Sequence, residues 1–108
     1  MGNETTFLDI ASVNDLPIGT TKKFVLNTGD ILLANVDGEI YAVDDMCTHE
    51  DSSLSLGCLK GELVSCTLHG SRFNVRTGEP MEEPATETLQ RYKVRIHNQR
   101  IEICLQPI

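Results

Sequence analysis

Two short clusters of cysteine and histidine are the residues of this chain best suited to chemistry. The first is Cys47–His49, with the sequence Cys-Thr-His, and the second is Cys66–His69, with the sequence Cys-Thr-Leu-His. Thiolate and imidazole are ligands that suit iron and zinc. Because each cluster supplies one thiolate and one imidazole, one iron of a two-iron centre could take both thiolates and the other both imidazoles. The pattern therefore favours a 2Fe–2S cluster.

Three other interpretations of the same residues stay open at this point. A structural zinc site is the main alternative, but zinc fingers usually separate their first two ligands by two to four residues. Here a single residue lies between Cys47 and His49. A Cys–His nucleophile pair for covalent catalysis would use one cluster and leave the other without a role. Chance is a poor explanation, because two of the three histidines of the chain fall in this spacing.

Length, composition and charge narrow the class of protein. The 108 residues and a hydrophobic fraction of 40% predict one globular domain spanning residues 1–108. A formal charge of −7 argues against nucleic acid and anionic lipid as partners, since both need a basic surface. We expect an acidic surface to dock on basic patches of partner proteins instead.

The N-terminal sequence carries no recognisable signal peptide, and no apolar run reaches the length of a membrane span. Gly2 and Thr6 match a myristoylation pattern, but the pattern is short. We expect a cytoplasmic monomer, in which four cysteines indicate metal binding rather than disulfides.

The periodicity of the apolar residues is mostly that of short strands separated by turns. Strands are expected at residues 7–10, 20–26, 31–36, 39–43, 62–65, 72–75, 92–96 and 101–105. Asp37-Gly38 and Asn98-Gln99 mark two hairpin turns. Residues 45–61 and 66–71 fit no strand period, and they hold all the candidate ligands. The fold class is therefore all-β, a small antiparallel sandwich or barrel.

The two ligand motifs, together with Gly70, Phe73 and the Thr77-Gly78 turn, resemble the Rieske 2Fe–2S family. Within that family the chain resembles the small ferredoxins of bacterial aromatic ring-hydroxylating dioxygenase systems. The resemblance runs from about residue 31 to residue 103. It implies a Rieske fold with a cluster-binding subdomain at about residues 45–85, which contains two ligand loops.

The resemblance also implies roles for the ligands and for partners. Cys47 and Cys66 would bind the buried iron, and His49 and His69 the iron near the surface. Electrons would come from an NAD(P)H-dependent flavin reductase and go to a terminal Rieske non-haem iron oxygenase. The chain itself would be a one-electron carrier and no enzyme. A Rieske carrier for a different oxygenase or redox complex is the alternative within the family.

Several residues near the motifs are expected to tune the cluster or to dock partners. Ser71 stands where such ferredoxins commonly have another residue, and its hydroxyl either donates to a cluster sulfur or faces solvent. Glu50 and Asp51 form either an acidic docking rim or a solvated loop. Pro84 falls where the family has a proline-containing loop that shields the cluster, although a simple surface loop explains it nearly as well.

The remaining cysteines and the third histidine have no expected ligand role. We expect Cys58 and Cys104 to be buried, small apolar residues, with a disulfide between them as the alternative. His97 is expected on the surface of the last hairpin. High-potential respiratory Rieske proteins join their ligand loops by a disulfide, but Ser52 and Leu68 occupy the matching positions here. The expected potential is therefore low for a Rieske protein, roughly −150 mV.

Overall fold

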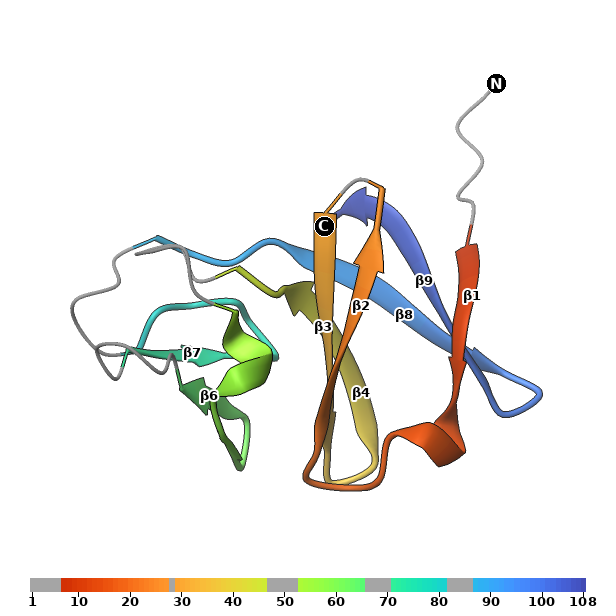
Figure 1. Ribbon diagram of the computed structural model, residues 1–108, viewed down its shortest axis with the longest axis horizontal. Helices are drawn as coiled ribbons and strands as arrows, with labels where there is room; N and C mark the ends of the chain where they lie inside the picture. The colour runs from red at the N-terminus through yellow and green to blue at the C-terminus, as the bar shows by residue number, and fades with distance from the viewer. Residues whose placement is uncertain (1–6, 28, 47–52, 66–70, 82–86) are drawn as a thin grey trace.

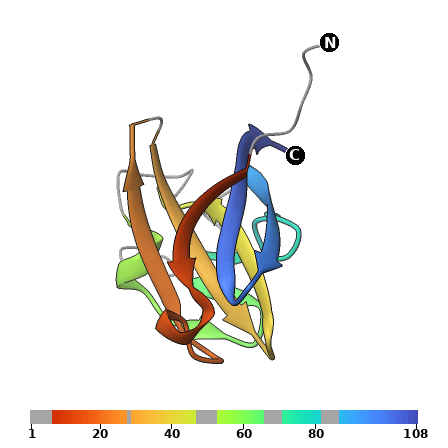
Figure 2. The same ribbon diagram turned by 90° about the vertical axis from the view of Figure 1, so that its right-hand side faces the viewer.

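The computed structural model describes residues 7–27, 29–46, 53–65, 71–81 and 87–108. A six-stranded antiparallel sheet, in the order β1-β9-β8-β4-β3-β2, forms most of this part of the chain. Its strands are β1 (Phe7–Ser12), β2 (Thr21–Leu26), β3 (Gly29–Val36), β4 (Glu39–Asp44), β8 (Arg91–His97) and β9 (Arg100–Pro107). The sheet curls into a nearly closed barrel (Figure 1, Figure 2).

A second, smaller sheet lies beside β3 and β4, on the side away from β1 and β9 (Figure 1). It has three antiparallel strands in the order β5-β6-β7. Their bounds are β5 (Leu59–Lys60), β6 (Leu63–Ser65) and β7 (Arg72–Asn74). The prediction of an all-β antiparallel fold is confirmed, and the two sheets divide it into a barrel and a smaller unit.

The hairpin turns form where the sequence predicts them. Asp37 and Gly38 both have positive φ, at 53° and 97°, and they join β3 to β4 in direct register from Val36 to Glu39. Two residues with positive φ match the twist of the flanking strands, which explains the Asp-Gly pair. Asn98 and Gln99 form the equivalent turn between β8 and β9, with φ of 51° and 63°.

Two short 3₁₀ helices depart from the expected elements. Helix η1 (Val13–Asp15) follows β1 directly, where Ser12 caps it and Asp15 completes the capping box. Helix η2 (Leu54–Leu56) and strand β5 both fall within residues 45–61, which we expected to contain no regular structure. That expectation was wrong for the second half of the segment, because each element is too short to show a period in the sequence. Among the described residues, no helix has the length and apolar character needed to cross a bilayer.

Strand β3 is buried on both faces, and this joins the two sheets. Leu32 and Ala34 belong to one core cluster, shared with residues of the smaller sheet such as Val64 and Phe73. Ile31 and Leu33 point to the other face and belong to the barrel core. Because side chains alternate along a strand, the continuous apolar run serves two cores. The smaller sheet is thus anchored on the outside of the barrel wall.

Candidate metal centre

The four predicted ligands, Cys47, His49, Cys66 and His69, lie outside the described residues. They belong to two loops, which we call the first loop (residues 47–52) and the second loop (residues 66–70). The predicted rim residues Glu50 and Asp51 lie in the first loop, and Pro84 lies in residues 82–86, so they are also outside the description. The structure does describe the bases of both loops, meaning the residues on either side of each.

The base of the second loop is a pair of hydrogen-bonded strands. Ser65 at the end of β6 pairs with Arg72 at the start of β7, so the loop connects two adjacent strands. Behind it, Val64 pairs with Phe73, and both side chains are fully buried. The burial of these apolar side chains against β3 holds the β6–β7 pair in place.

The base of the first loop is closed by an isolated bridge between Met46 and Ser53. Asp45, only 1% exposed, supports this bridge from within. Its carboxylate accepts hydrogen bonds from the Ser53 hydroxyl and, at 2.9 Å, from the backbone N–H of Ser55. Its backbone carbonyl accepts from the N–H of Leu54 at 2.7 Å. A buried carboxylate needs such donors, because its desolvation is otherwise costly.

The two bases touch each other through Gly57, the residue that follows η2. A Cβ atom at Gly57 would lie 1.7 Å from the carbonyl oxygen of Ser65, the residue before Cys66. The N–H of Ser65 donates to the carbonyl of Cys58 at 3.0 Å. Only a glycine allows this approach, because there is no space for a Cβ atom. The backbone conformation is not the reason, since the φ of Gly57, −91°, suits any residue. The segment that follows the first loop is therefore held against the residue that precedes the second loop.

This arrangement fits a centre with two thiolates and two imidazoles. Each iron of a two-iron cluster needs two protein ligands. The structure brings together the bases of two loops, and the sequence of each loop contains one cysteine and one histidine. Among the described residues, no group of three or more His, Cys, Asp or Glu side chains is placed to hold a metal ion.

The two cysteines outside the motifs differ from each other. Cys104 is buried, 3% exposed, on β9, as expected. Cys58 is exposed, so the prediction that it is buried was wrong. Cys58 directly precedes the short strand β5, which lies at the edge of the smaller sheet. Both are free thiols, so the alternative of a disulfide between them is also wrong.

Ser71 and His97 have contrasting environments. Ser71 follows the second loop directly and is fully buried, so the alternative of a hydroxyl facing solvent is wrong. A buried hydroxyl requires hydrogen-bond partners inside the protein. His97 is exposed at the end of β8, which confirms the expectation of a surface strand residue.

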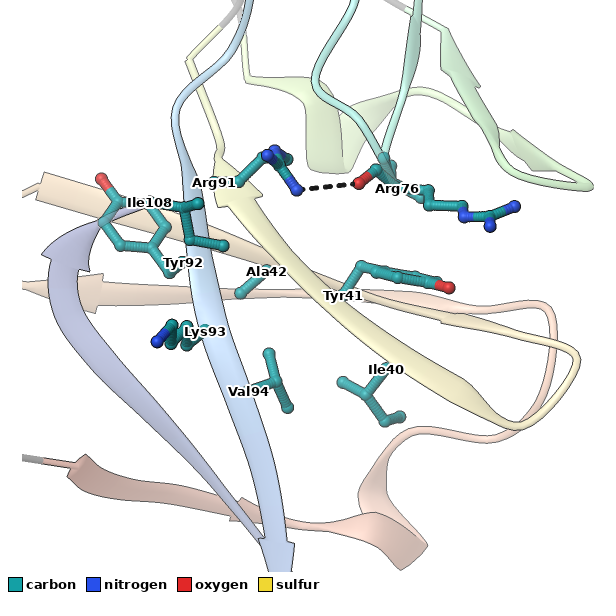
Figure 3. Close-up of a pocket in the computed structure, with 10 residues that line it drawn as sticks. Ile40, Tyr41, Ala42, Arg76, Arg91, Tyr92, Lys93, Val94 and Ile108 are labelled. Atoms are coloured by element: carbon teal, nitrogen blue, oxygen red, sulfur yellow. Dashed lines mark hydrogen bonds between the residues drawn. The ribbon is translucent and has the colours of Figure 1, made fainter.

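A groove between β4 and β8 is a feature that the sequence did not reveal. The two strands pair only at Ala42–Tyr92 and Val43–Arg91 and then diverge, leaving a cavity of about 220 Å³ (Figure 3). Among the described side chains that line it are three cations, of Arg76, Arg91 and Lys93, but no side-chain carboxylate, thiol or imidazole. The Arg91 guanidinium donates to the carbonyl oxygen of Arg76 at 3.3 Å, which ties β8 to the segment after β7.

Tyr92 links β8 to the end of β4, one residue before Asp45. Its hydroxyl donates to the Asp44 carboxylate at 2.5 Å. Burial, with this hydrogen bond and the charge of Asp44, raises the pKa of Tyr92 well above its usual value. The carboxylate of Asp44 is thus hydrogen-bonded to β8, whereas that of Asp45 is hydrogen-bonded to the residues that follow the first loop.

Comparison with known proteins agrees with this geometry. A family model described as the Rieske [2Fe-2S] domain matches residues 6–93. A relative from Ralstonia sp, the ferredoxin component of naphthalene 1,2-dioxygenase/salicylate 5-hydroxylase systems, is 39% identical over 95 residues, covering 88% of this chain and 91% of the relative. The biphenyl dioxygenase ferredoxin subunit of Pseudomonas sp. (strain KKS102) is 38% identical over 97 residues, covering 89% of each chain.

Solved structures show the same likeness. The ferredoxin of carbazole 1,9a-dioxygenase from Nocardioides aromaticivorans IC177 superimposes with a TM-score of 0.87 at 25% identity, covering 93% of this chain and 98% of the other. A chain from a complex of reduced oxygenase and oxidized ferredoxin in carbazole 1,9a-dioxygenase reaches a TM-score of 0.91 at 28% identity, covering 97% and 98%.

Proposed function

Since this chain belongs to the Rieske [2Fe-2S] domain family, we propose that Cys47, His49, Cys66 and His69 hold its cluster and that it carries electrons between a flavin reductase and a terminal oxygenase. The chain is a ferredoxin-type electron-transfer protein with one 2Fe–2S cluster, and it is not itself an enzyme. The observation that carries the ligand proposal is the contact of the two loop bases through Gly57.

The ligands would divide by type. Cys47 and Cys66 would hold the inner iron and His49 and His69 the outer one, in a cluster-binding subdomain at about residues 45–85. When bound, the cluster accepts and releases one electron at a potential well above that of all-cysteine plant-type ferredoxins. The residues of this chain position the cluster and surround it with dipoles and charges. His49 and His69 would lie nearest the partner and mark the path of the electron.

The names of the relatives and one solved complex support the proposed partners. Several relatives are named as ferredoxin components of naphthalene or biphenyl dioxygenase systems, and one solved complex joins a ferredoxin to an oxygenase. We infer a transient chain of transfer in the cytoplasm, from an NAD(P)H-dependent flavin reductase through this protein to a terminal Rieske non-haem iron oxygenase for aromatic compounds. A different oxygenase or redox complex is the alternative destination.

Glu50 and Asp51 would provide an acidic rim beside the outer iron. An acidic rim attracts basic partner surfaces over a range of about 8–10 Å at moderate ionic strength. We expect the rate of electron transfer to the oxygenase to fall steeply with added salt, and Glu50→Gln with Asp51→Asn to flatten that dependence. A rate that does not respond to salt would remove the docking role.

Spectroscopy tests the cluster directly. The purified protein is expected to be coloured, to bleach on reduction and to give a rhombic electron-spin signal, whereas a zinc-stabilised module would be colourless and silent. Single substitutions of each ligand, such as Cys47→Ser or His69→Ala, should abolish these signals. Cys104→Ser and His97→Ala are matched controls of the same residue types, and they should retain the signals.

Reconstitution tests the pathway. The protein, a candidate reductase and a candidate oxygenase are mixed with NAD(P)H, and oxidation of an aromatic substrate is followed with and without the ferredoxin. Turnover that depends on this chain supports the proposed route. Efficient cluster reduction without transfer to any aromatic oxygenase would favour the alternative destination.

A further inference from the structure

Asp45 makes hydrogen bonds both to the residues that follow the first loop and to strand β3 of the barrel. On the side after the loop, its carboxylate accepts from the Ser53 hydroxyl and the Ser55 N–H. On the side before the loop, its own backbone N–H donates to the carbonyl of Asp30 at 3.1 Å, at the start of β3. Asp45, two residues before Cys47, therefore also holds the residues that follow the loop and attaches both ends to the barrel.

Lys23 on β2 forms an ion pair with this carboxylate. Its ammonium lies 3.9 Å from Oδ2 of Asp45 and 3.4 Å from Oδ2 of Asp30. The side chain of Lys23 is 37% exposed, whereas that of Asp45 is 1% exposed. One partly solvated cation thus faces two carboxylates, so the net formal charge of these three side chains is negative.

The chain itself limits how far this charge lies from the proposed ligands. Asp45 is two residues from Cys47, so their Cα atoms are at most about 7 Å apart. Allowing for the side chains, the carboxylate would lie on the order of 10 Å from a centre bound through Cys47, which is about one Debye length at moderate salt, and burial weakens screening further. One-electron reduction adds a negative charge to the site. Asp45 therefore opposes reduction, and Lys23 favours it.

From these contacts, and on the basis of the proposed function, we propose that Asp45 positions the first loop and that Asp45 and Lys23 together bias the midpoint potential of the cluster. The proposal has a geometric part, in which hydrogen bonds to Asp45 hold the two ends of the first loop together. It also has an electrostatic part, in which the charge of the buried Asp45 is only partly offset by that of the more exposed Lys23. The two parts are separable by substitution.

Three variants separate them. Asp45→Asn removes the charge but keeps an amide that can accept from Ser55 N–H and donate to Ser53 Oγ. Asp45→Ala removes both the charge and the hydrogen bonds. Lys23→Met removes the compensating cation at a partly exposed position. Lys22→Met is the matched control, because Lys22 is the adjacent residue of β2 and lies over the Phe24 ring, 5.8 Å from its centre.

The measurements are the midpoint potential, from a redox titration followed by absorbance and electron spin resonance, and the half-life of the bound cluster. At fixed solution potential, Asp45→Asn should raise the ratio of reduced to oxidised protein and Lys23→Met should lower it. The Asp45→Asn change should be about twofold to fifteenfold for a unit charge roughly 10 Å away in an effective dielectric of about 80 to 20. The Lys23→Met change should be smaller, because Lys23 is more exposed than Asp45. Lys22→Met should stay near the unmodified value, and Asp45→Ala should lose its cluster faster than Asp45→Asn.

Each part can fail separately. Unchanged potentials in both Asp45→Asn and Lys23→Met would overturn the electrostatic part, and equal cluster half-lives in Asp45→Ala and the unmodified protein would overturn the positioning part. Circular dichroism of each variant without its cluster shows whether the fold is intact, and so distinguishes weaker cluster binding from unfolding of the protein. If the unmodified protein holds no 2Fe–2S cluster, the proposed function fails instead.

Discussion

The bases of the two loops are built by different means. The first is closed by one isolated bridge and by hydrogen bonds to the buried carboxylate of Asp45. The second is closed by the paired strands β6 and β7, with the apolar side chains of Val64 and Phe73 behind it. The first base therefore depends on polar groups with specific partners, and the second on packing. A change of charge should disturb the first base most, and a change of volume the second.

Phe73→Ala should have the largest effect on stability, because it removes the main apolar contact beneath the second base. Phe73 is fully buried, and a change of this kind costs about 3–5 kcal/mol. Urea unfolding of the protein without its cluster measures the cost. Phe24→Ala, in the partly buried rim of the barrel core, should cost less and leave cluster content unchanged. Equal cluster loss in both variants would contradict a special role for the second base.

Gly57→Ala should be the next most damaging change, because it pushes the two bases apart. The added Cβ would lie 1.7 Å from a backbone oxygen, which cannot move as the end of a flexible side chain could. We expect a cost of up to about 3 kcal/mol and a cluster that is bound poorly. Gly61→Asn is the control, because Gly61 has open space around it and a φ of 60°, which asparagine tolerates. An intact cluster in Gly57→Ala would contradict the contact.

Tyr92→Phe should have a moderate effect that depends on pH. The raised pKa keeps the phenol protonated in the folded protein where it ionises in the unfolded chain, at about pH 10. The resulting stability is fully present below pH 10 and declines as the pH rises further. The substitution should cost about 1 kcal/mol at neutral pH by removing the hydrogen bond to Asp44 and should weaken that decline. Thermal unfolding from pH 8 to 11 measures both, and parallel curves for the two proteins would contradict the role of Tyr92.

Ser71→Ala should have the smallest effect on stability and act mainly on the cluster. If the buried hydroxyl donates to a cluster sulfur, its removal should lower the midpoint potential modestly. Ser12→Ala is the control, because it removes the cap of η1 and costs about 1 kcal/mol without changing the potential. An unchanged potential in Ser71→Ala would contradict the tuning role of Ser71.

Much of this protein was predictable because the relevant information is local in the sequence. The Asp37-Gly38 pair determines a hairpin turn through its positive φ angles, and the apolar run of β3 predicts a strand. The two Cys–His motifs predict the kind of centre, since the ligand types and their spacing decide which metal they suit. These features need only neighbouring residues, so the sequence by itself determined the fold class, the family and the proposed ligand set.

Only the tertiary structure decided how the bases of the loops are supported. Nothing in the spacing shows that Asp45 meets Lys23 of β2, because that contact depends on where the β2–β3 hairpin lies relative to the end of β4. The same holds for the contact of Gly57 with Ser65, the burial of Ser71 and the exposure of Cys58. Each depends on which distant backbone comes close, and that follows from packing the small sheet on the barrel rather than from the order of residues in either loop.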